Sequence, residues 1–191
     1  MFQMVCKYLR KRIDSGLPAL SVSVNVSRLA LFQKDFIEFY TETKKAYRIP
    51  DGLLDLEFTE SIVFKDYAFF NNTVKILQKN GFLCSMDDFG SGYSSLNVLK
   101  DISIDILKLD MLFFQGNHSD PRRGQIVISN IIAMARELNI VTIAEGVEQI
   151  GQVDFLRRVG CNLIQGYTFS KPLPYADFDR LYQNSHGRLP L

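Results

Sequence analysis

Carboxylate side chains stand at the ends of several apolar runs in this sequence, where their spacing suits one kind of chemistry. Asp87 and Asp88 are adjacent and follow the apolar run of residues 81–84. Glu57 and Glu145 end two other runs. Buried carboxylates are costly unless they are paired or bound to a cation. The adjacent pair therefore marks either a solvated strand end that caps the next turn or a place that holds a positive charge.

Every candidate metal ligand of this cluster binds through an oxygen atom. If the runs are strands that end at one rim, they bring together Asn25, Glu57, Asp87, Asp88 and Glu145. Oxygen ligands suit Mg²⁺ or Mn²⁺, whereas zinc prefers nitrogen and sulfur. Adjacent carboxylates can hold two metal ions about 3.5–4 Å apart, which suits in-line displacement at phosphorus. The pattern predicts a two-metal site for phosphoryl chemistry, although Asn25 in a turn could bond only to backbone.

Lys108 and Glu145 are candidates for direct roles in such a reaction. Lys108 can orient a water molecule or neutralise charge on a pentacoordinate phosphoryl group. Glu145 can be a metal ligand or the general base, and the sequence leaves both roles open. Lys108 equally suits an ion pair with Asp105 or Asp110 at the rim, and that alternative stays open too.

Short apolar runs alternate with segments of helical spacing along the chain. The predicted strands are Leu20–Val26, Leu53–Thr59, Phe82–Asp87, Ile104–Leu109, Val141–Ala144 and Asn162–Gln165. Helical spacing is clear around Ile128, Ile131 and Ile132, and a last helix is expected over Tyr175–Gln183. This alternation predicts an α/β fold with a mainly parallel sheet.

Polar residues at the ends of nearly all these strands favour a barrel over an open sheet. An open sheet gathers ligands at one switch point, whereas a barrel brings the carboxyl ends of all its strands to one rim. A (β/α)8 barrel takes about 250 residues, and this chain has 191. We therefore predict one domain with a TIM-like (β/α) barrel that is incomplete, with about six of the eight strands present.

The charge, the cysteine content and the apolar runs of the sequence limit which partners and which cellular compartment are expected. The 22 basic and 21 acidic residues form no basic stripe, so duplex nucleic acid is not an expected partner. The three cysteines show no Cys-x-x-Cys spacing, which is typical of a reducing compartment. No run approaches the roughly 18 apolar residues that span a bilayer, and the first residues do not form a secretory signal. We expect a cytoplasmic protein with no membrane segment in this chain.

Six motifs occur in order and together carry a resemblance to a known family. They are NVS at 25–27, EFTE at 57–60, DDFGSGYSSL at 87–96, LKLD at 107–110, AEGVE at 144–148 and QGY at 165–167. With them the sequence resembles the EAL domain family from about Leu20 to Leu173. The resemblance implies a TIM-like barrel that hydrolyses cyclic di-GMP to linear pGpG in bacterial second-messenger signalling, with two Mg²⁺ or Mn²⁺ ions.

The resemblance also implies metal ligands at matching positions. Asn25, Glu57 and Asp87 match ligands of the first metal, and Asp87 also matches the carboxylate that bridges both metals. Asp88 matches a ligand of the second metal, and Glu145 lies near it as a ligand or as the base.

Other matching positions imply roles around the metals. Lys108 matches the lysine that holds the catalytic water, and Glu60 matches the glutamate that anchors the loop after Asp88. Glu148 and Gln165 match positions around the substrate and the metal.

The sequence departs from the family pattern at its beginning. It contains no Glu-Ala-Leu motif, so the family's first two strands are expected to be absent from a single, N-terminally truncated EAL-type domain over residues 1–191. Three hypotheses follow: an active phosphodiesterase, a non-catalytic cyclic di-GMP receptor, or an inactive fragment of a longer phosphodiesterase. The expected partners are cyclic di-GMP, a second copy in a homodimer and, in a longer protein, a sensor or cyclase domain.

Overall fold

The computed structural model describes residues 1–63, 66–90, 96–111 and 121–185, so residues 91–95 of the DDFGSGYSSL motif lie outside the described part. Its strands are β1 (Val22–Asn25), β2 (Leu54–Thr59), β3 (Leu83–Phe89), β4 (Ile106–Asp110), β5 (Val141–Glu145) and β6 (Leu163–Ile164). Its helices are α1 (Phe2–Asp14), α2 (Arg28–Leu31), α3 (Phe36–Ala46), α4 (Glu60–Val63), α5 (Tyr67–Lys79), α6 (Leu96–Asp101), α7 (Pro121–Glu137), α8 (Ile150–Val159) and α9 (Tyr175–Asn184). None of the described helices is both long and apolar enough to cross a membrane.

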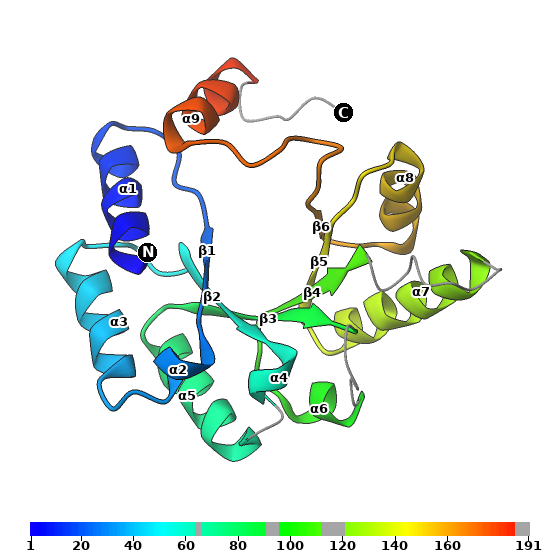
Figure 1. The fold of residues 1–191 in the computed structure, drawn as a ribbon, viewed down its shortest axis with the longest axis horizontal. Coiled ribbons are helices and arrows are strands. Elements are labelled where there is room, and N and C mark those ends of the chain that lie inside the picture. Colours follow the sequence, from blue (N-terminus) through cyan, green and yellow to red (C-terminus); the bar gives the residue numbers. More distant parts are fainter. Residues whose placement is uncertain (64–65, 91–95, 112–120, 186–191) are drawn as a thin grey trace.

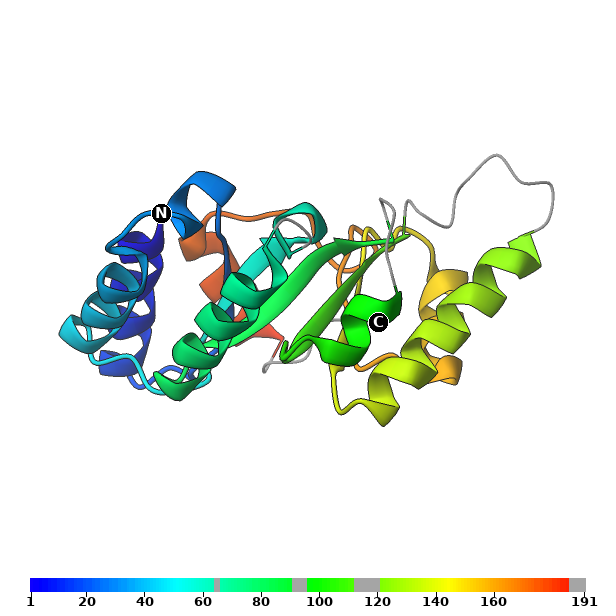
Figure 2. The same cartoon turned by 90° about the horizontal axis from the view of Figure 1, so that it is seen from below.

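The strands form one parallel sheet in the order β1-β2-β3-β4-β5-β6. Figure 1 shows the sheet curling inside a ring of helices, and Figure 2 shows α5 lying along β3. A sequential strand order has no switch point and is the order of a barrel. Among the described strands, β1 and β6 each pair on one side only. The predicted incomplete TIM-like barrel is therefore confirmed.

Side chains along β1 and β2 alternate between an apolar outer face and a polar inner face. On β2, Leu54, Leu56 and Phe58 are fully buried in the core under the helices. The alternate residues Asp55 and Glu57 lie on the inner face and are also buried. The sequence LDLEFT therefore has a period of two, and its polar half faces the interior of the barrel.

The predicted strands are all present, and their ends differ from the prediction by at most two residues. β3 continues past Asp87 to Phe89, where a register shift between Met86 and Phe89 lets the strand carry extra residues. β6 is shorter than predicted because Asn162 bonds through its side chain instead of the sheet ladder. Its Oδ1 accepts from the N–H of Thr142 at 2.9 Å and from Oγ1 of Thr142 at 3.0 Å.

Local sequence sets the ends of the longer helices. The Asp66 side chain caps α5 by accepting from the N–H of Phe69 at 3.1 Å. The helix ends before Gly81, which has a φ of +76° that glycine adopts at little cost. α8 ends at Gly160 in the left-handed conformation, with φ +83°. Each of these two helices thus ends at or next to a glycine, the residue type expected at a helix end.

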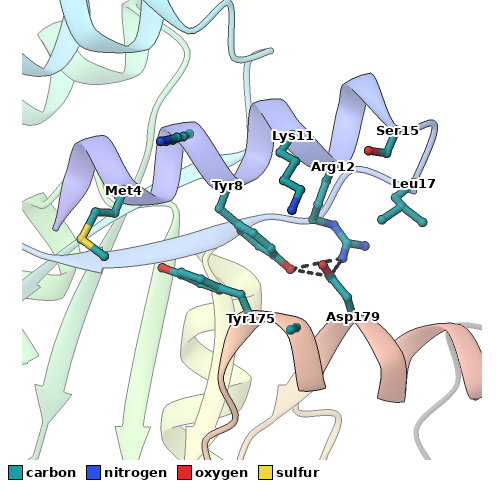
Figure 3. Close-up of a pocket in the computed structure, with 10 residues that line it drawn as sticks. Met4, Tyr8, Lys11, Arg12, Ser15, Leu17, Tyr175 and Asp179 are labelled. Carbon is teal, nitrogen blue, oxygen red and sulfur yellow. Dashed lines mark hydrogen bonds and ion pairs between the residues drawn. The ribbon is translucent and has the colours of Figure 1, made fainter.

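Helix α9 is held to α1 by a small polar and aromatic cluster, although none of its side chains is fully buried. Figure 3 shows Tyr8 and Arg12 of α1 converging on Asp179 of α9. The Tyr8 hydroxyl donates to Asp179 at 2.6 Å, and the buried guanidinium of Arg12 pairs with the same carboxylate. Tyr8 also stacks on Tyr175, with ring centroids 4.3 Å apart. The chain after β6 is thus tied back to the helix that precedes β1.

We expect Asp179→Asn to loosen α9, because it removes the charge that pairs with the buried Arg12. Asp179 is partly exposed, so the cost is about 1.5 kcal/mol rather than that of a fully buried pair, which corresponds to about tenfold faster local opening. Amide hydrogen exchange over residues 175–184 measures this. Asp177→Asn on the same helix is the control, because its pair with Arg180 is exposed and should change exchange less than twofold. Equal exchange in the two variants contradicts the proposed role of the Arg12–Asp179 pair in holding α9 to α1.

Candidate functional site

The predicted site residues lie at or near the carboxyl ends of neighbouring strands. Asn25 ends β1 and is the register partner of Glu57 on β2. Asp87 lies on β3, Lys108 on β4, and Glu145 ends β5. Since all strands are parallel, their carboxyl ends meet at one rim of the curled sheet. The structure thus places these residues along one rim, and their joint action as a site stays a prediction.

Lys108 is the centre of this cluster. Its Nζ forms an ion pair with Glu57 and a second pair, at 2.6 Å, with Oε1 of Glu145. The side chains of Lys108 and Glu57 are each 6% exposed and that of Glu145 is 22% exposed. Burial lowers the pKa of Lys108, but the hydrogen bonds with Glu145 and Glu57 outweigh burial and hold the pKa above its usual value. The lysine is therefore a fixed positive charge.

Of the two alternative partners that the sequence offered for Lys108, Asp105 is engaged elsewhere in the described structure. Asp105 accepts from the backbone N–H of Cys84 at 2.8 Å and from Nε2 of Gln78 at 3.0 Å. Asp110 is the register partner of Glu145 on the next strand. Lys108 instead forms ion pairs with Glu57 and Glu145, across the inner face of the sheet.

Asp87 and Asp88 form a turned pair at the end of β3. Asp88 has a φ of +58°, an uncommon conformation that aspartate tolerates better than most side chains. Its N–H donates to Oδ1 of Asp87 at 2.9 Å. Burial raises the pKa of Asp88, and the charges of Asp87 and Asp110 raise it further. This end of the strand therefore concentrates negative charge.

Glu60 connects the end of β2 to the turn after β3. It is buried at the start of α4, and its Oε2 accepts from the N–H of Gly90 at 3.2 Å. Gly90 has a φ of +98°, which favours glycine at this turn. This contact is the kind that a loop anchor needs, and the anchoring role of Glu60 stays a prediction.

Glu148 and Gln165 do not contact the Lys108 cluster but line a neighbouring cavity of about 560 Å³. Asp110 and Gly166 also line it. Gly166 is required there, because a Cβ at this position would lie 2.0 Å from the carbonyl oxygen of Val147. A cavity of this size is typical of small-molecule sites, so it suits the predicted substrate-side role of both residues.

Asp55 and Asp110 are acidic neighbours of the site that the sequence analysis did not select as site residues. Asp55 is 1% exposed, and its Oδ2 accepts from the hydroxyls of Ser23 at 2.8 Å and Ser85 at 3.0 Å. Burial raises its pKa to about 6, although both hydroxyl bonds act in the opposite direction. The signal for both residues was their spacing, since Asp55 lies two positions before Glu57 and Asp110 two after Lys108.

The chemistry of these donors fits a hard divalent cation. All candidate ligands offer oxygen, and burial together with neighbouring carboxylates raises the pKa of Asp88 and of Glu145. A cation would relieve that crowding of negative charge. In the described part of the chain, however, no three His, Cys, Asp or Glu side chains converge on one point. Lys108 supplies the positive charge that Glu57 and Glu145 share.

Comparison with known proteins gives a consistent set of relatives. The family model of the EAL domain matches residues 1–172. Signaling protein YkoW of Bacillus subtilis is 38% identical over 175 residues, which cover 92% of this chain and 22% of YkoW. The chain spans about a quarter of the length of the curated relatives it matches.

Solved structures that superpose on this chain include an EAL domain and a phosphodiesterase. The EAL domain of Mycobacterium smegmatis DcpA superposes with a TM-score of 0.87 at 31% identity, covering 98% of this chain and 83% of that chain. The MucR phosphodiesterase of Pseudomonas aeruginosa, in a c-di-GMP complex, superposes with a TM-score of 0.85 at 32% identity. That match covers 93% of this chain and 71% of the MucR chain.

The raised pKa of Asp55 predicts a pH dependence of stability. Its pKa is about 6 when folded and 3.8 in the reference state, so the folded chain binds the proton more tightly. The contribution to the free energy of unfolding is therefore present below about pH 4 and is lost as the pH rises through 6. Between pH 7 and pH 4 we expect the wild type to gain about 2 to 3 kcal/mol relative to Asp55→Asn.

Urea denaturation of both chains at several pH values, with EDTA present, checks this expectation. The wild type and Asp55→Asn share every other titrating group, so the difference between their curves isolates Asp55. Parallel curves for the two chains contradict the predicted titration.

Proposed function

This chain belongs to the EAL domain family, and on that basis we propose that it is a metal-dependent phosphodiesterase domain that hydrolyses cyclic di-GMP to linear pGpG. The observation that carries the proposal is the buried Lys108 between Glu57 and Glu145, on the strand next to the Asp87–Asp88 pair. In the reaction, a water oxygen bonds to one phosphorus, the bond from that phosphorus to the 3′ oxygen breaks, and the released oxygen takes a proton.

The proposed ligands of the first Mg²⁺ or Mn²⁺ are Asn25, Glu57 and Asp87. Asp87 would bridge to a second metal that Asp88 also binds. Bound metals of this kind lower the pKa of a water molecule and neutralise charge on the phosphoryl oxygens. The register pairing of Asn25 with Glu57 and the turn at Asp88 support this set, because both bring oxygen donors to the same rim.

Lys108 and Glu145 have the roles closest to the reacting atoms in this proposal. Lys108 stays protonated because two carboxylates hold its pKa high, so it can donate a hydrogen bond to the attacking water or to a phosphoryl oxygen. Glu145 is partly exposed and has a raised pKa, caused first by burial. It can bind metal or take a proton from the water.

The other predicted roles are part of the same proposal. Glu148 and Gln165 would contact the substrate from the cavity that they line. Glu60 would hold the turn after β3 through Gly90. We also propose action in the cytoplasm, pairing with a second copy of the chain, and, within a longer protein, a sensor or cyclase domain as neighbour.

We expect the purified chain with Mn²⁺ to release pGpG from cyclic di-GMP, detected by chromatography. Asp87→Ala should lower the rate at least 100-fold, because it removes the oxygen proposed to bind both metals. Binding of cyclic di-GMP without turnover, at any Mn²⁺ concentration, contradicts the phosphodiesterase proposal and favours a receptor.

Lys108→Met should lower kcat about 10²- to 10³-fold, by a larger factor than it changes KM, because it removes a charge that acts on the transition state. Steady-state kinetics with Mn²⁺ and cyclic di-GMP measure both constants. Lys100→Met is the control, since that lysine is exposed and forms only a 3.7 Å pair with Asp101. A kcat for Lys108→Met within a few-fold of the control rules out the proposed role of Lys108.

A further inference from the structure

A second set of polar side chains lies two residues before the proposed ligands of the first metal, on the same three strands. In strand order β1, β2, β3, the proposed ligands are Asn25, Glu57 and Asp87, and the earlier residues are Ser23, Asp55 and Ser85. A spacing of two residues puts both sets on the inner face of the sheet.

Hydrogen bonds join the earlier set into one unit, the Ser23–Asp55–Ser85 bridge. The Ser23 hydroxyl donates to Oδ2 of Asp55 at 2.8 Å, and the Ser85 hydroxyl donates to the same oxygen at 3.0 Å. Asp55 is 1% exposed and Ser85 is fully buried. The bond from Ser85 is buried, whereas Ser23 is exposed at the β1 edge of the sheet. Hydrogen bonds to a charged group are stronger than those between neutral groups, so one carboxylate ties three strands together.

The register of the strands makes one contact of this bridge direct and the other diagonal. Ser23 is the direct partner of Asp55, as Asn25 is of Glu57. β3 is staggered, so Ser85 is the partner of Glu57 and Asp55 reaches it diagonally. The bridge therefore joins β2 to β3 diagonally through side chains, in addition to the backbone hydrogen bonds of the ladder.

We propose that the Ser23–Asp55–Ser85 bridge is a positioning device for the first metal site, which fixes the relative placement of the three strands whose next inward residues bind the metal. The inference rests on the proposed function, because it assigns the bridge a task only if Asn25, Glu57 and Asp87 hold a metal. Residues that support metal ligands in this way typically change metal affinity 10- to 100-fold when they are removed.

Mn²⁺ binding to the whole chain, measured by electron paramagnetic resonance of the free ion, tests the proposal without relying on turnover. The double variant Ser23→Ala with Ser85→Ala should bind Mn²⁺ 10- to 100-fold more weakly than the wild type. Thr142→Val is the matched control, because it removes a hydroxyl that is as buried as that of Ser85 and that links β5 to Asn162 away from the proposed ligands. Its affinity should stay within about twofold, and an equal loss in both variants overturns the proposal.

Two variants of Asp55 distinguish the effect of its hydrogen bonds from the effect of its negative charge. Asp55→Asn keeps an oxygen that can accept both hydroxyls, so its loss of Mn²⁺ affinity should be less than tenfold. Asp55→Ala removes the acceptor, and its loss should match that of the double serine variant. If Asp55→Asn binds as weakly as Asp55→Ala, the charge of Asp55 acts rather than the bridge, and the proposal is wrong.

Asp87→Ala separates failure of this inference from failure of the proposed function. If the wild type binds Mn²⁺ no better than Asp87→Ala, the metal site itself is absent, and both proposals fall. If the wild type binds better than Asp87→Ala but equals the double serine variant, the metal site stands and the positioning inference alone is overturned.

Discussion

The buried ammonium of Lys108 is the interaction on which the geometry of this site depends. It lies on β4 and pairs with Glu57 on β2 and Glu145 on β5, so it links three strands of which β2 is not its neighbour. Each of these charges alone in the interior would cost several kcal/mol, and only their pairing offsets that cost. The curl of the sheet toward its inner face shortens the distance that Lys108 spans across β3, so the barrel curvature favours these ion pairs.

The alternation of side chains explains how one short sheet supports both a core and a site. Residues of β2 on the outer face, such as Leu54 and Leu56, join the core under the helices, and the residues between them carry charge to the inner face. A fully apolar strand would stabilise the sheet equally well, but it would place no charged or polar side chain on the inner face. The cost of burying charge is met by mutual pairing at Lys108 and by the hydroxyls around Asp55.

Negative charge at the rim is only partly balanced by the described side chains. Lys108 serves Glu57 and Glu145, while the pKa of Asp88 is raised by burial and by the nearby Asp87 and Asp110. Sites with perturbed carboxylates in a concave rim are commonly functional rather than structural. This imbalance agrees with the metal proposed above and with the cavity beside it, into which Glu148 and Gln165 face.

Much of the fold was predictable from local sequence, because strand and helix patterns depend on periods of a few residues. The six strands, their parallel pairing and the helix ends at Gly81 and Gly160 follow from apolar spacing and from glycine. The family was also predictable, since six motifs occur in the expected order.

The sequence by itself therefore determined the elements, the family and the strand ends at which polar residues gather. The tertiary structure alone decided which charges pair: Lys108 bonds to Glu57 and Glu145 rather than to Asp105 or Asp110. It also decided that Asp55 is buried and bonded to two serines. The physical reason is that a partner across the sheet is chosen by register, stagger and curvature, and these quantities arise from all the strands together rather than from any one of them.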